Sequence, residues 1–236
     1  MTDVVVFSSC TAAKDDSVPI ERPRIEPSEY VGDSQLLRKL LETRKVILSW
    51  PEAKKGDRET YAFDLYVRKG QMYAAVYEHH YQRLRAALMD GIMNVEWFFI
   101  SGGYGIVNAL EPACAYQATL NKAIHYQKGV PFTAELWQPT LGNICKGVMS
   151  HHSESKIYVF GGRDYTSYFE GVPHPREMRI FKSAKTVGGR RLSPVLADFV
   201  SGLLRAELNP FDKAFPPGLL EWSDSEGKWV ASGALR

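Results

Sequence analysis

A short apolar run that opens into glycines constrains the fold of this chain more than any other feature. Residues 95–100, VEWFFI, are rich in aromatic and branched side chains, which is typical of a buried strand. The next residues, 101–106, place three glycines where that strand ends. In an open α/β sheet, loops at the carboxyl ends of strands bind ligands because they present free backbone N–H groups. The spacing equally fits a tight turn lined by core aromatics, since glycine-rich loops are common.

Two further segments repeat this pattern of a strand followed by a loop. Residues 4–7 predict a strand buried on both faces, as in a parallel sheet, and the small polar loop 8–14 follows them. Residues 156–160 predict another strand, which ends at the glycine pair of loop 161–165. Helical patterns alternate with these strands, which favours an α/β fold with a mixed, partly parallel sheet flanked by helices. We therefore expect loops 8–14, 101–116 and 161–165 to meet at one edge of the sheet.

Helices are predicted where apolar side chains recur at intervals of three and four residues. The segments with helical character are residues 34–43, 61–67, 72–89, 118–124, 133–149 with a break at Pro139, and 193–204. Residues 45–50 favour a strand, and residues 173–191 are expected to be irregular and basic. We expect one α/β domain at residues 1–172, with a basic C-terminal extension at 173–236 packed on the same domain.

Composition indicates a globular protein without a membrane segment. The 236 residues are 44% hydrophobic and 24% charged, and no apolar run approaches the roughly 18 residues that span a bilayer. The first residues lead directly into a strand pattern, without the basic region of a signal peptide. Three cysteines without metal-like spacing fit a reducing cytoplasm. With a net charge of only +2, any nucleic-acid surface must come from local clusters of charge.

Candidate binding residues gather on the three loops. Tyr104, Tyr116 and Tyr165 offer aromatic faces on which a flat ring can stack. Lys14 and Arg163 can bind a phosphate or donate to a leaving group. The other candidates for binding a base or nucleotide are Ser8, Ser9, Cys10, Ser101, Gly102, Gly103, Gly161 and Gly162. For the cysteine, the alternative is a small buried residue without chemistry.

Asp164 and Glu111 are the candidate catalytic carboxylates. A carboxylate placed against a sugar stabilises an oxocarbenium-like charge and can activate water. Each also has a plainer interpretation. Asp164 can form an ion pair or a helix cap beside Arg163, and Glu111 can begin a helix before Pro112. No histidine or cysteine spacing predicts a metal site, and no cofactor is expected.

Residues 174–191 form a basic segment that contains six cations and one acid, Glu177. The cations are Arg176, Arg179, Lys182, Lys185, Arg190 and Arg191. Neutralising phosphates supplies most of the non-specific affinity of proteins for DNA, so the segment suits contact with a DNA backbone. An ordinary solvated face is the alternative.

The order of these motifs resembles the YaaA-like family, that is, peroxide stress protein YaaA and related domains. The family pattern Ser-Gly-x-Tyr-Gly, an acidic or polar spacer and then Tyr is met by Ser101, Gly102, Tyr104, Gly105, Glu111 and Tyr116. Weaker similarities lie at Lys69, Gly70 and Tyr73, at loop 8–14, and at residues 162–169. In loop 8–14 the family's proline is missing and the spacing is longer. The resemblance covers residues 1–172.

The resemblance implies an α/β fold that binds DNA and is linked to DNA damage or modified bases. Some YaaA-like defence proteins are regarded as DNA glycosylases that excise glucosylated cytosines. On this interpretation, a cytoplasmic enzyme of phage defence flips a modified base out of double-stranded DNA into the niche between the three loops. It then hydrolyses the N-glycosidic bond without a cofactor. The alternatives are a non-catalytic YaaA-like DNA-binding protein and a nucleoside or nucleotide-sugar hydrolase.

Overall fold

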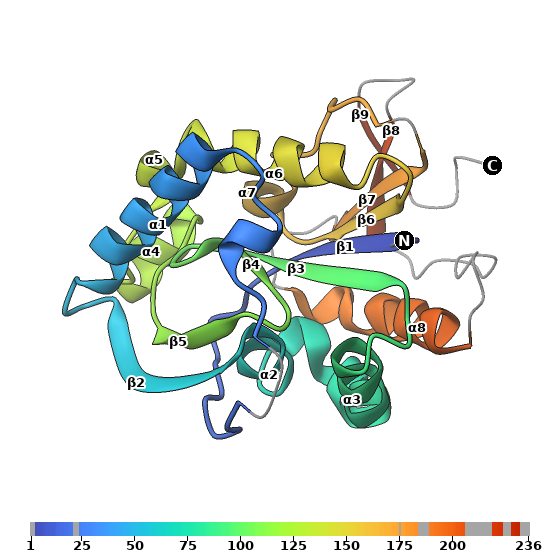
Figure 1. Ribbon diagram of the computed structural model, residues 1–236, viewed down its shortest axis with the longest axis horizontal. Coiled ribbons are helices and arrows are strands. Elements are labelled where there is room, and N and C mark those ends of the chain that lie inside the picture. The colour runs from blue at the N-terminus through green and yellow to red at the C-terminus, as the bar shows by residue number, and fades with distance from the viewer. Residues whose placement is uncertain are drawn as a thin grey trace.

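A mixed sheet between two layers of helices forms the body of the protein (Figure 1). The structure is a computed structural model that describes residues 3–20, 24–174, 176–183, 189–205, 219–223 and 228–231. Within these ranges the sheet has seven strands in the order β4-β3-β1-β6-β7-β8-β9. They are β1 (Val4–Ser9), β3 (Val95–Ser101), β4 (Gly105–Asn108), β6 (Lys156–Phe160), β7 (Met178–Ser183), β8 (Leu219–Ser223) and β9 (Lys228–Ala231). A separate antiparallel pair consists of β2 (Lys54–Tyr61) and β5 (Pro112–Tyr116).

The inner strands of the sheet are parallel. β1 pairs in parallel with β3 on one side and with β6 on the other, and β6 pairs in parallel with β7. The outer strands β4, β8 and β9 are antiparallel to their neighbours. The predicted α/β class, with a mixed and partly parallel sheet, is therefore confirmed. β1, β3 and β6 end side by side, and we call this side of the sheet the carboxyl edge.

Helices cover both faces of the sheet (Figure 1). One face carries α1 (Ser34–Leu48) and α6 (Thr140–His151), and the other carries α2 (Ala62–Val67), α3 (Ala74–Met89) and α8 (Ser193–Leu204). Shorter helices are α4 (Lys122–Lys128), α5 (Ala134–Trp137) and α7 (Arg163–Thr166), with 3-10 turns η1 (Pro27–Glu29), η2 (Gln71–Tyr73) and η3 (Gly189–Arg191). Within the described part of the chain, no helix combines the length and apolar character needed to cross a membrane.

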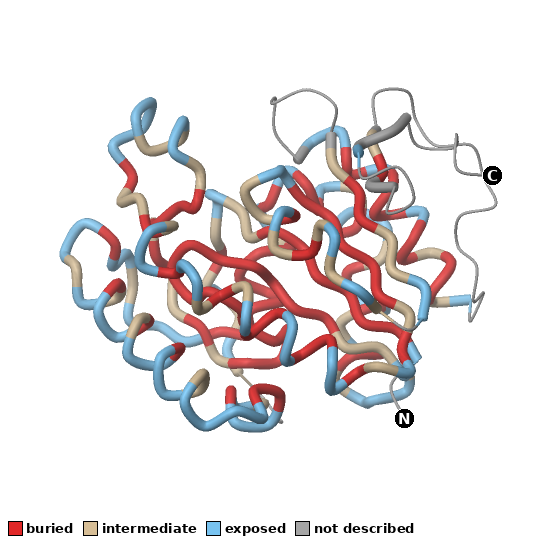
Figure 2. Tube along the Cα trace, turned by 90° about the horizontal axis from the view of Figure 1, so that it is seen from above, coloured by how far each residue is buried: buried red, intermediate tan, exposed pale blue. Residues whose placement is uncertain are grey.

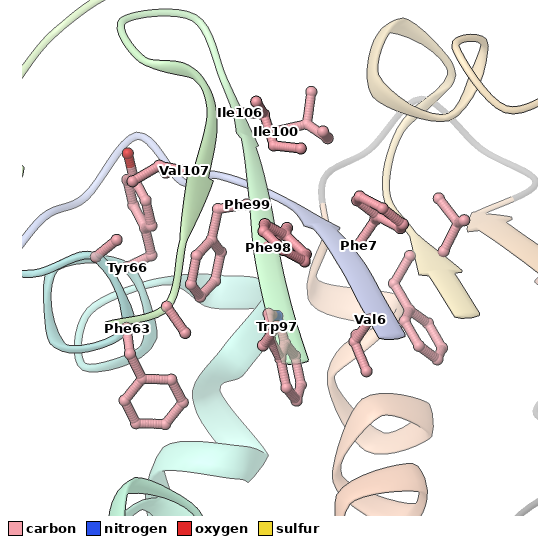
Figure 3. Packing of buried hydrophobic residues seen from close by; sticks show 14 of the residues in the cluster. Val6, Phe7, Phe63, Tyr66, Trp97, Phe98, Phe99, Ile100, Ile106 and Val107 are labelled. Carbon is pink, nitrogen blue, oxygen red and sulfur yellow. The ribbon is translucent and has the colours of Figure 1, made fainter. Parts of the chain in front are cut away.

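The apolar sequence of β1 explains its central place. Every residue of the strand is buried, and Figure 2 shows burial running along the middle of the sheet. Phe7 stacks on Phe98, with ring centroids 5.4 Å apart, and packs against Phe169 on the same face. Val6 and Trp97 point to the opposite face, toward the helices drawn below the sheet (Figure 3). A strand that is covered on both faces needs this kind of continuous apolar run.

Three predicted segments fold differently from expectation. Residues 118–124, predicted as a helix, are helical only from Lys122, because Asn121 caps α4. Residues 45–50, predicted as a strand, mostly continue α1, because Leu40, Arg44 and Ile47 lie on one helical face and are buried. Residues 173–191, predicted as irregular, contain β7, because pairing with β6 outweighs the cations in its sequence. The described parts of residues 173–236 thus add β7, β8 and β9 to the sheet and α8 to a helical layer.

Candidate functional site

Side chains from the three predicted loops meet at the carboxyl edge of the sheet. We call Cys10, Lys14, Tyr116, Asp164 and Tyr165 the carboxyl-edge cluster. Cys10 follows β1 directly. Burial raises the pKa of both Tyr116 and Tyr165, and the nearby Cys10 adds to both shifts, so the three side chains lie close together. The Nζ of Lys14 lies 4.0 Å from the centroid of the Tyr116 ring. The cluster therefore joins loop 8–14 to the end of loop 101–116 and to loop 161–165.

Lys14 is half-buried and its amine lies over aromatic surface. Its Nζ donates a hydrogen bond of 2.8 Å to the carbonyl oxygen of Thr11, which fixes the side chain within its own loop. Burial lowers the pKa of Lys14 to about 8, and the neighbouring Cys10 opposes this shift only in part. The group therefore titrates close to neutral pH, unlike an ordinary surface lysine.

The carboxylate next to Lys14 in the sequence is engaged elsewhere. Asp15 Oδ2 lies 3.4 Å from Arg68 Nη1 and 3.6 Å from Lys69 Nζ, and Asp15 Oδ1 accepts a hydrogen bond from the Ser17 N–H. Burial alone would raise the pKa of Asp15, but these hydrogen bonds and cations lower it overall. In the described ranges, Lys14 consequently has no carboxylate at ion-pair distance.

Buried hydroxyls form the floor under the Lys14 amine. Ser101 Oγ and Tyr116 Oη are 2.5 Å apart, and Tyr66 Oη donates to Tyr116 Oη at 3.1 Å. Burial raises the pKa of both tyrosines well above the ordinary value, so they stay neutral. Ser101 Oγ also accepts hydrogen bonds from the N–H groups of Gly103 and Tyr104. The amides that the sequence suggested for a ligand are therefore occupied by the protein itself.

Close packing accounts for the glycines of this loop. A Cβ on Gly103 would lie 2.5 Å from the Tyr116 ring, and one on Gly105 would lie 2.7 Å from the Trp137 ring. Gly105 also has φ +69°, in the left-handed region that favours glycine. The carbonyl oxygen of Gly102 accepts hydrogen bonds from Thr133 Oγ1 and Trp137 Nε1. These contacts correspond to the tight turn lined by core aromatics, which was the alternative interpretation.

Glu111 is buried in an ion pair and lies directly before β5, not at the start of a helix. Its Oε1 lies 2.5 Å from Arg44 Nη1, and its Oε2 accepts hydrogen bonds from Tyr30 Oη and the Asn108 N–H. Burial alone would lower the pKa of Arg44, but the charge of Glu111 raises it. Both carboxylate oxygens thus have protein partners, which differs from the free catalytic carboxylate that we expected.

Tyr104 lies beside this ion pair rather than on an open surface. It is 6% exposed, its Oη accepts a hydrogen bond from the Cys114 N–H, and its carbonyl oxygen accepts one from Arg44 Nε. Its ring packs edge-on against Tyr116, with centroids 5.3 Å apart. Tyr116 is itself 2% exposed. Of the three tyrosines predicted to stack on a ligand, only Tyr165 is partly rather than fully buried, and it also packs against the core.

Asp164 is half-buried in the first turn of α7. Its Oδ2 accepts a hydrogen bond from Asn121 Nδ2, and Asn121 Oδ1 in turn caps α4 by accepting from the Ile124 N–H. No cation among the described residues, Arg163 included, lies at ion-pair distance from this carboxylate. The catalytic role predicted for Asp164 stays a prediction, and its carboxylate is held in place by a neutral partner.

The remaining loop residues are divided between core and surface. Ser8 Oγ is buried and accepts hydrogen bonds from Tyr73 Oη and Trp97 Nε1, so it serves the core. Ser9 lies against Gly161, where a Cβ would come within 3.3 Å of the serine Cβ. Among the candidate residues of the three loops, Gly162 and Arg163 are the exposed ones.

Two cations of the predicted basic segment are paired within the protein. Arg176 Nη2 lies 2.7 Å from Glu154 Oε2, beside the start of β6 and therefore at the amino edge of the sheet. Arg179, within β7, binds both carboxylate oxygens of Glu221. The expectation that these two arginines bind a DNA backbone stays a prediction, although each already has a carboxylate partner within the protein.

Lys182, Arg190 and Arg191 lie toward the carboxyl edge. Lys182 is half-buried, and burial together with the charge of Arg163 lowers its pKa. Arg190 and Arg191 are exposed on η3, which packs against η2. η2 lies against the end of β1, where Met72 Sδ accepts a hydrogen bond from Ser9 Oγ. Lys185 lies outside the described residues.

Sequence reasoning missed three residues that organise this edge. Asn121 binds Asp164, Thr119 is a hydrogen-bond partner of Tyr165, and Arg44 binds Glu111. Asn121 had a signal, because it stands in the capping position before a helical pattern. Within the described ranges, no group of three His, Cys, Asp or Glu side chains could hold a metal ion.

No protein-family model matches the chain, and no match is found among curated proteins.

Proposed function

We propose that this protein is a YaaA-like DNA glycosylase that excises a modified base from DNA and leaves an abasic site. The proposal depends above all on one observation: an amine and an aromatic ring lie beside Cys10 at the carboxyl edge, and a carboxylate lies next to that ring in α7. These are Lys14, Tyr165 and Asp164. The resemblance of the 101–116 segment to the YaaA-like family supports the same function.

The chemistry needs a group for each charge that develops as the glycosidic bond breaks. The target base leaves the helical stack, at a cost of a few kcal/mol, and packs on Tyr165. Asp164 stabilises the oxocarbenium-like sugar and takes a proton from the attacking water. Lys14, which is mostly protonated at pH 7 because its pKa is about 8, donates to the departing base. Water adds at C1′ of the sugar and the base leaves with a proton.

The exposed cations at the same edge suit the phosphates of the substrate. Arg190, Arg191 and Arg163 are exposed. Phosphate contacts of this kind position a duplex without reading its sequence. Specificity then comes from the extruded base, for which a glucosylated hydroxymethylcytosine is our first candidate, as in the related defence proteins.

The test is base excision from DNA of defined modification. Purified protein is incubated with unmodified, hydroxymethylated and glucosylated duplexes, and abasic sites are counted with an aldehyde-reactive probe. We expect abasic sites only in a modified duplex. Asp164→Asn should slow their formation by roughly 10²–10⁴-fold, the usual contribution of a general acid or base. The matched control is Glu154→Gln, an exposed carboxylate at the amino edge, which should keep the wild-type rate.

Intact glycosidic bonds in every duplex would overturn the proposal. If the protein then still binds DNA in a salt-sensitive manner, and Asp164→Asn leaves that binding unchanged, the non-catalytic DNA-binding alternative holds.

A second candidate is a hydrolase of nucleosides or nucleotide sugars. The ion pairs of Arg176 with Glu154 and of Arg179 with Glu221 favour it, because they withdraw two cations that a DNA-binding surface could use. The same experiment with free modified nucleosides separates the two functions. Turnover of nucleoside without excision from DNA would support this candidate.

A further inference from the structure

We propose that Lys14 captures the aldehyde of an abasic sugar as an imine, so that the carboxyl edge retains its own product. The inference rests on the function proposed above, because abasic DNA is the product of that reaction. It assigns to Lys14 a covalent step that follows departure of the base.

The placement of the Lys14 amine supports a nucleophile. Its Nζ lies 4.0 Å from the centroid of the Tyr116 ring and 6.0 Å from that of Tyr66. Among the described residues, its hydrogen-bond partner is the carbonyl oxygen of Thr11, a neutral acceptor. The face of the Tyr116 ring attracts a cation, but burial disfavours the charged form of the amine and lowers its pKa. Buried amines of this kind serve as imine-forming groups in enzymes.

Lys14 also has no carboxylate at ion-pair distance in the part of the chain that the structure describes. Asp15, its neighbour in the sequence, is held by Arg68 and Lys69 through ion pairs of 3.4 and 3.6 Å. A carboxylate beside the amine would keep it protonated and unreactive. In this loop, Asp15 instead lies against Arg68 and Lys69, and the Lys14 amine lies over the Tyr116 ring.

The protonation state follows from this placement. With a pKa of about 8, about a tenth of Lys14 is the free amine at pH 7. An ordinary lysine, with a pKa of about 10.4, has roughly one free amine in 2,500 at that pH. At pH 7 the fraction of Lys14 that is free amine is therefore more than a hundred times that of an ordinary lysine.

The reaction balances without a redox partner. The free amine attacks C1′ of the ring-opened sugar and forms a carbinolamine. The carbinolamine loses its hydroxyl as water, with one proton from the nitrogen, and becomes an imine. Addition of water reverses both steps and releases the DNA. The abasic strand is thus held covalently but reversibly, which keeps an unstable product from solvent.

Borohydride trapping tests the inference. The full chain is mixed with a duplex that carries a preformed abasic site, and sodium borohydride reduces any imine to a stable secondary amine. Peptide mapping by mass spectrometry should place the adduct on Lys14, and its yield should rise about tenfold from pH 6 to pH 7, since the free amine reacts. Lys14→Arg should abolish the adduct. Lys69→Arg, which alters the other lysine beside Asp15, should retain it.

The outcomes separate this inference from the proposed function. The preformed abasic site needs no base excision, so an adduct on Lys14 supports the inference even if every modified duplex stays intact. Free 2-deoxyribose 5-phosphate offers the same aldehyde without a duplex, so weak DNA binding does not mask the result. Adducts spread over surface lysines, or no adduct with either probe, would overturn the inference. Mapping on the wild-type protein needs no variant and is unaffected by poor folding of Lys14→Arg.

Discussion

Arg44 joins the helix α1 to the buried side of the glycine-rich hairpin. Its guanidinium donates to the carbonyl oxygens of Tyr104 and Ile106 and to both oxygens of Glu111. A buried ion pair overcomes the cost of desolvation only when such hydrogen bonds are complete. Removing one ion of the pair therefore costs more stability than the intact pair contributes, because the other charge stays buried without a partner.

Arg44→Met should lower the free energy of unfolding by about 3–5 kcal/mol, because it leaves the Glu111 carboxylate buried without a cation. Urea unfolding followed by circular dichroism measures this loss. The control is Arg24→Met, whose pair with Glu59 is about half exposed and should be worth less than about 1 kcal/mol. Equal losses in the two variants would contradict the role assigned to Arg44.

The sequence could not predict this pair, and the reason lies in distance along the chain. Arg44 and Glu111 are 67 residues apart. Arg44 stands among Arg38, Lys39, Glu42 and Lys45 on a helix, where a cation is ordinarily solvated. Glu111 was a catalytic candidate because it stands in a loop predicted to lie at the carboxyl edge. A carboxylate in such a loop can serve either chemistry or a buried ion pair. Only the tertiary contact distinguishes these two explanations.

At the scale of elements, the turn between β3 and β4 depends on a glycine that also has no room for a side chain. Gly105→Ala should lower the free energy of unfolding by about 2–5 kcal/mol, since the left-handed backbone costs about 1–2 kcal/mol and overpacking against Trp137 adds about 1–3 kcal/mol. Gly129→Ala is the matched control. It has φ +63° but no atom within 4 Å of the added Cβ, so only the backbone penalty should remain.

Chemical denaturation of both variants checks this difference. A loss for Gly105→Ala no larger than that for Gly129→Ala would mean that the Trp137 contact does not constrain the turn.

The sequence predicted correctly those elements whose local pattern of apolar residues matches their burial in the fold. β3 and β6 are apolar and short, and α8 begins and ends where its pattern does. The errors fall where tertiary contacts override local preference. Residues 45–48 contain the β-branched Val46 and Ile47, yet burial of Ile47 on the face of α1 keeps them helical. β7 carries Arg179 and Lys182, which obscure a strand that pairs in parallel with β6.

At the scale of the whole molecule, the two edges of the sheet have different surroundings. The meeting of the three loops could be predicted because parallel strands must end at the same edge. The distribution of the basic residues could not, because β7 runs from one edge to the other. Arg176 consequently lies at the amino edge in an ion pair, whereas Arg190 and Arg191 lie on η3 near the end of β1.

This distribution predicts which cations control DNA binding. If the carboxyl edge faces DNA, neutralising Arg190 and Arg191 together by Arg→Gln should reduce the slope of log K against log salt by about 2, because each phosphate contact contributes about 0.9. Arg176→Gln should leave the slope unchanged, since that arginine is bound to Glu154 at the opposite edge. Fluorescence anisotropy of a labelled duplex over a series of salt concentrations measures both slopes. A larger change for Arg176→Gln than for the double variant would place the DNA at the amino edge, away from Asp164 and Lys14.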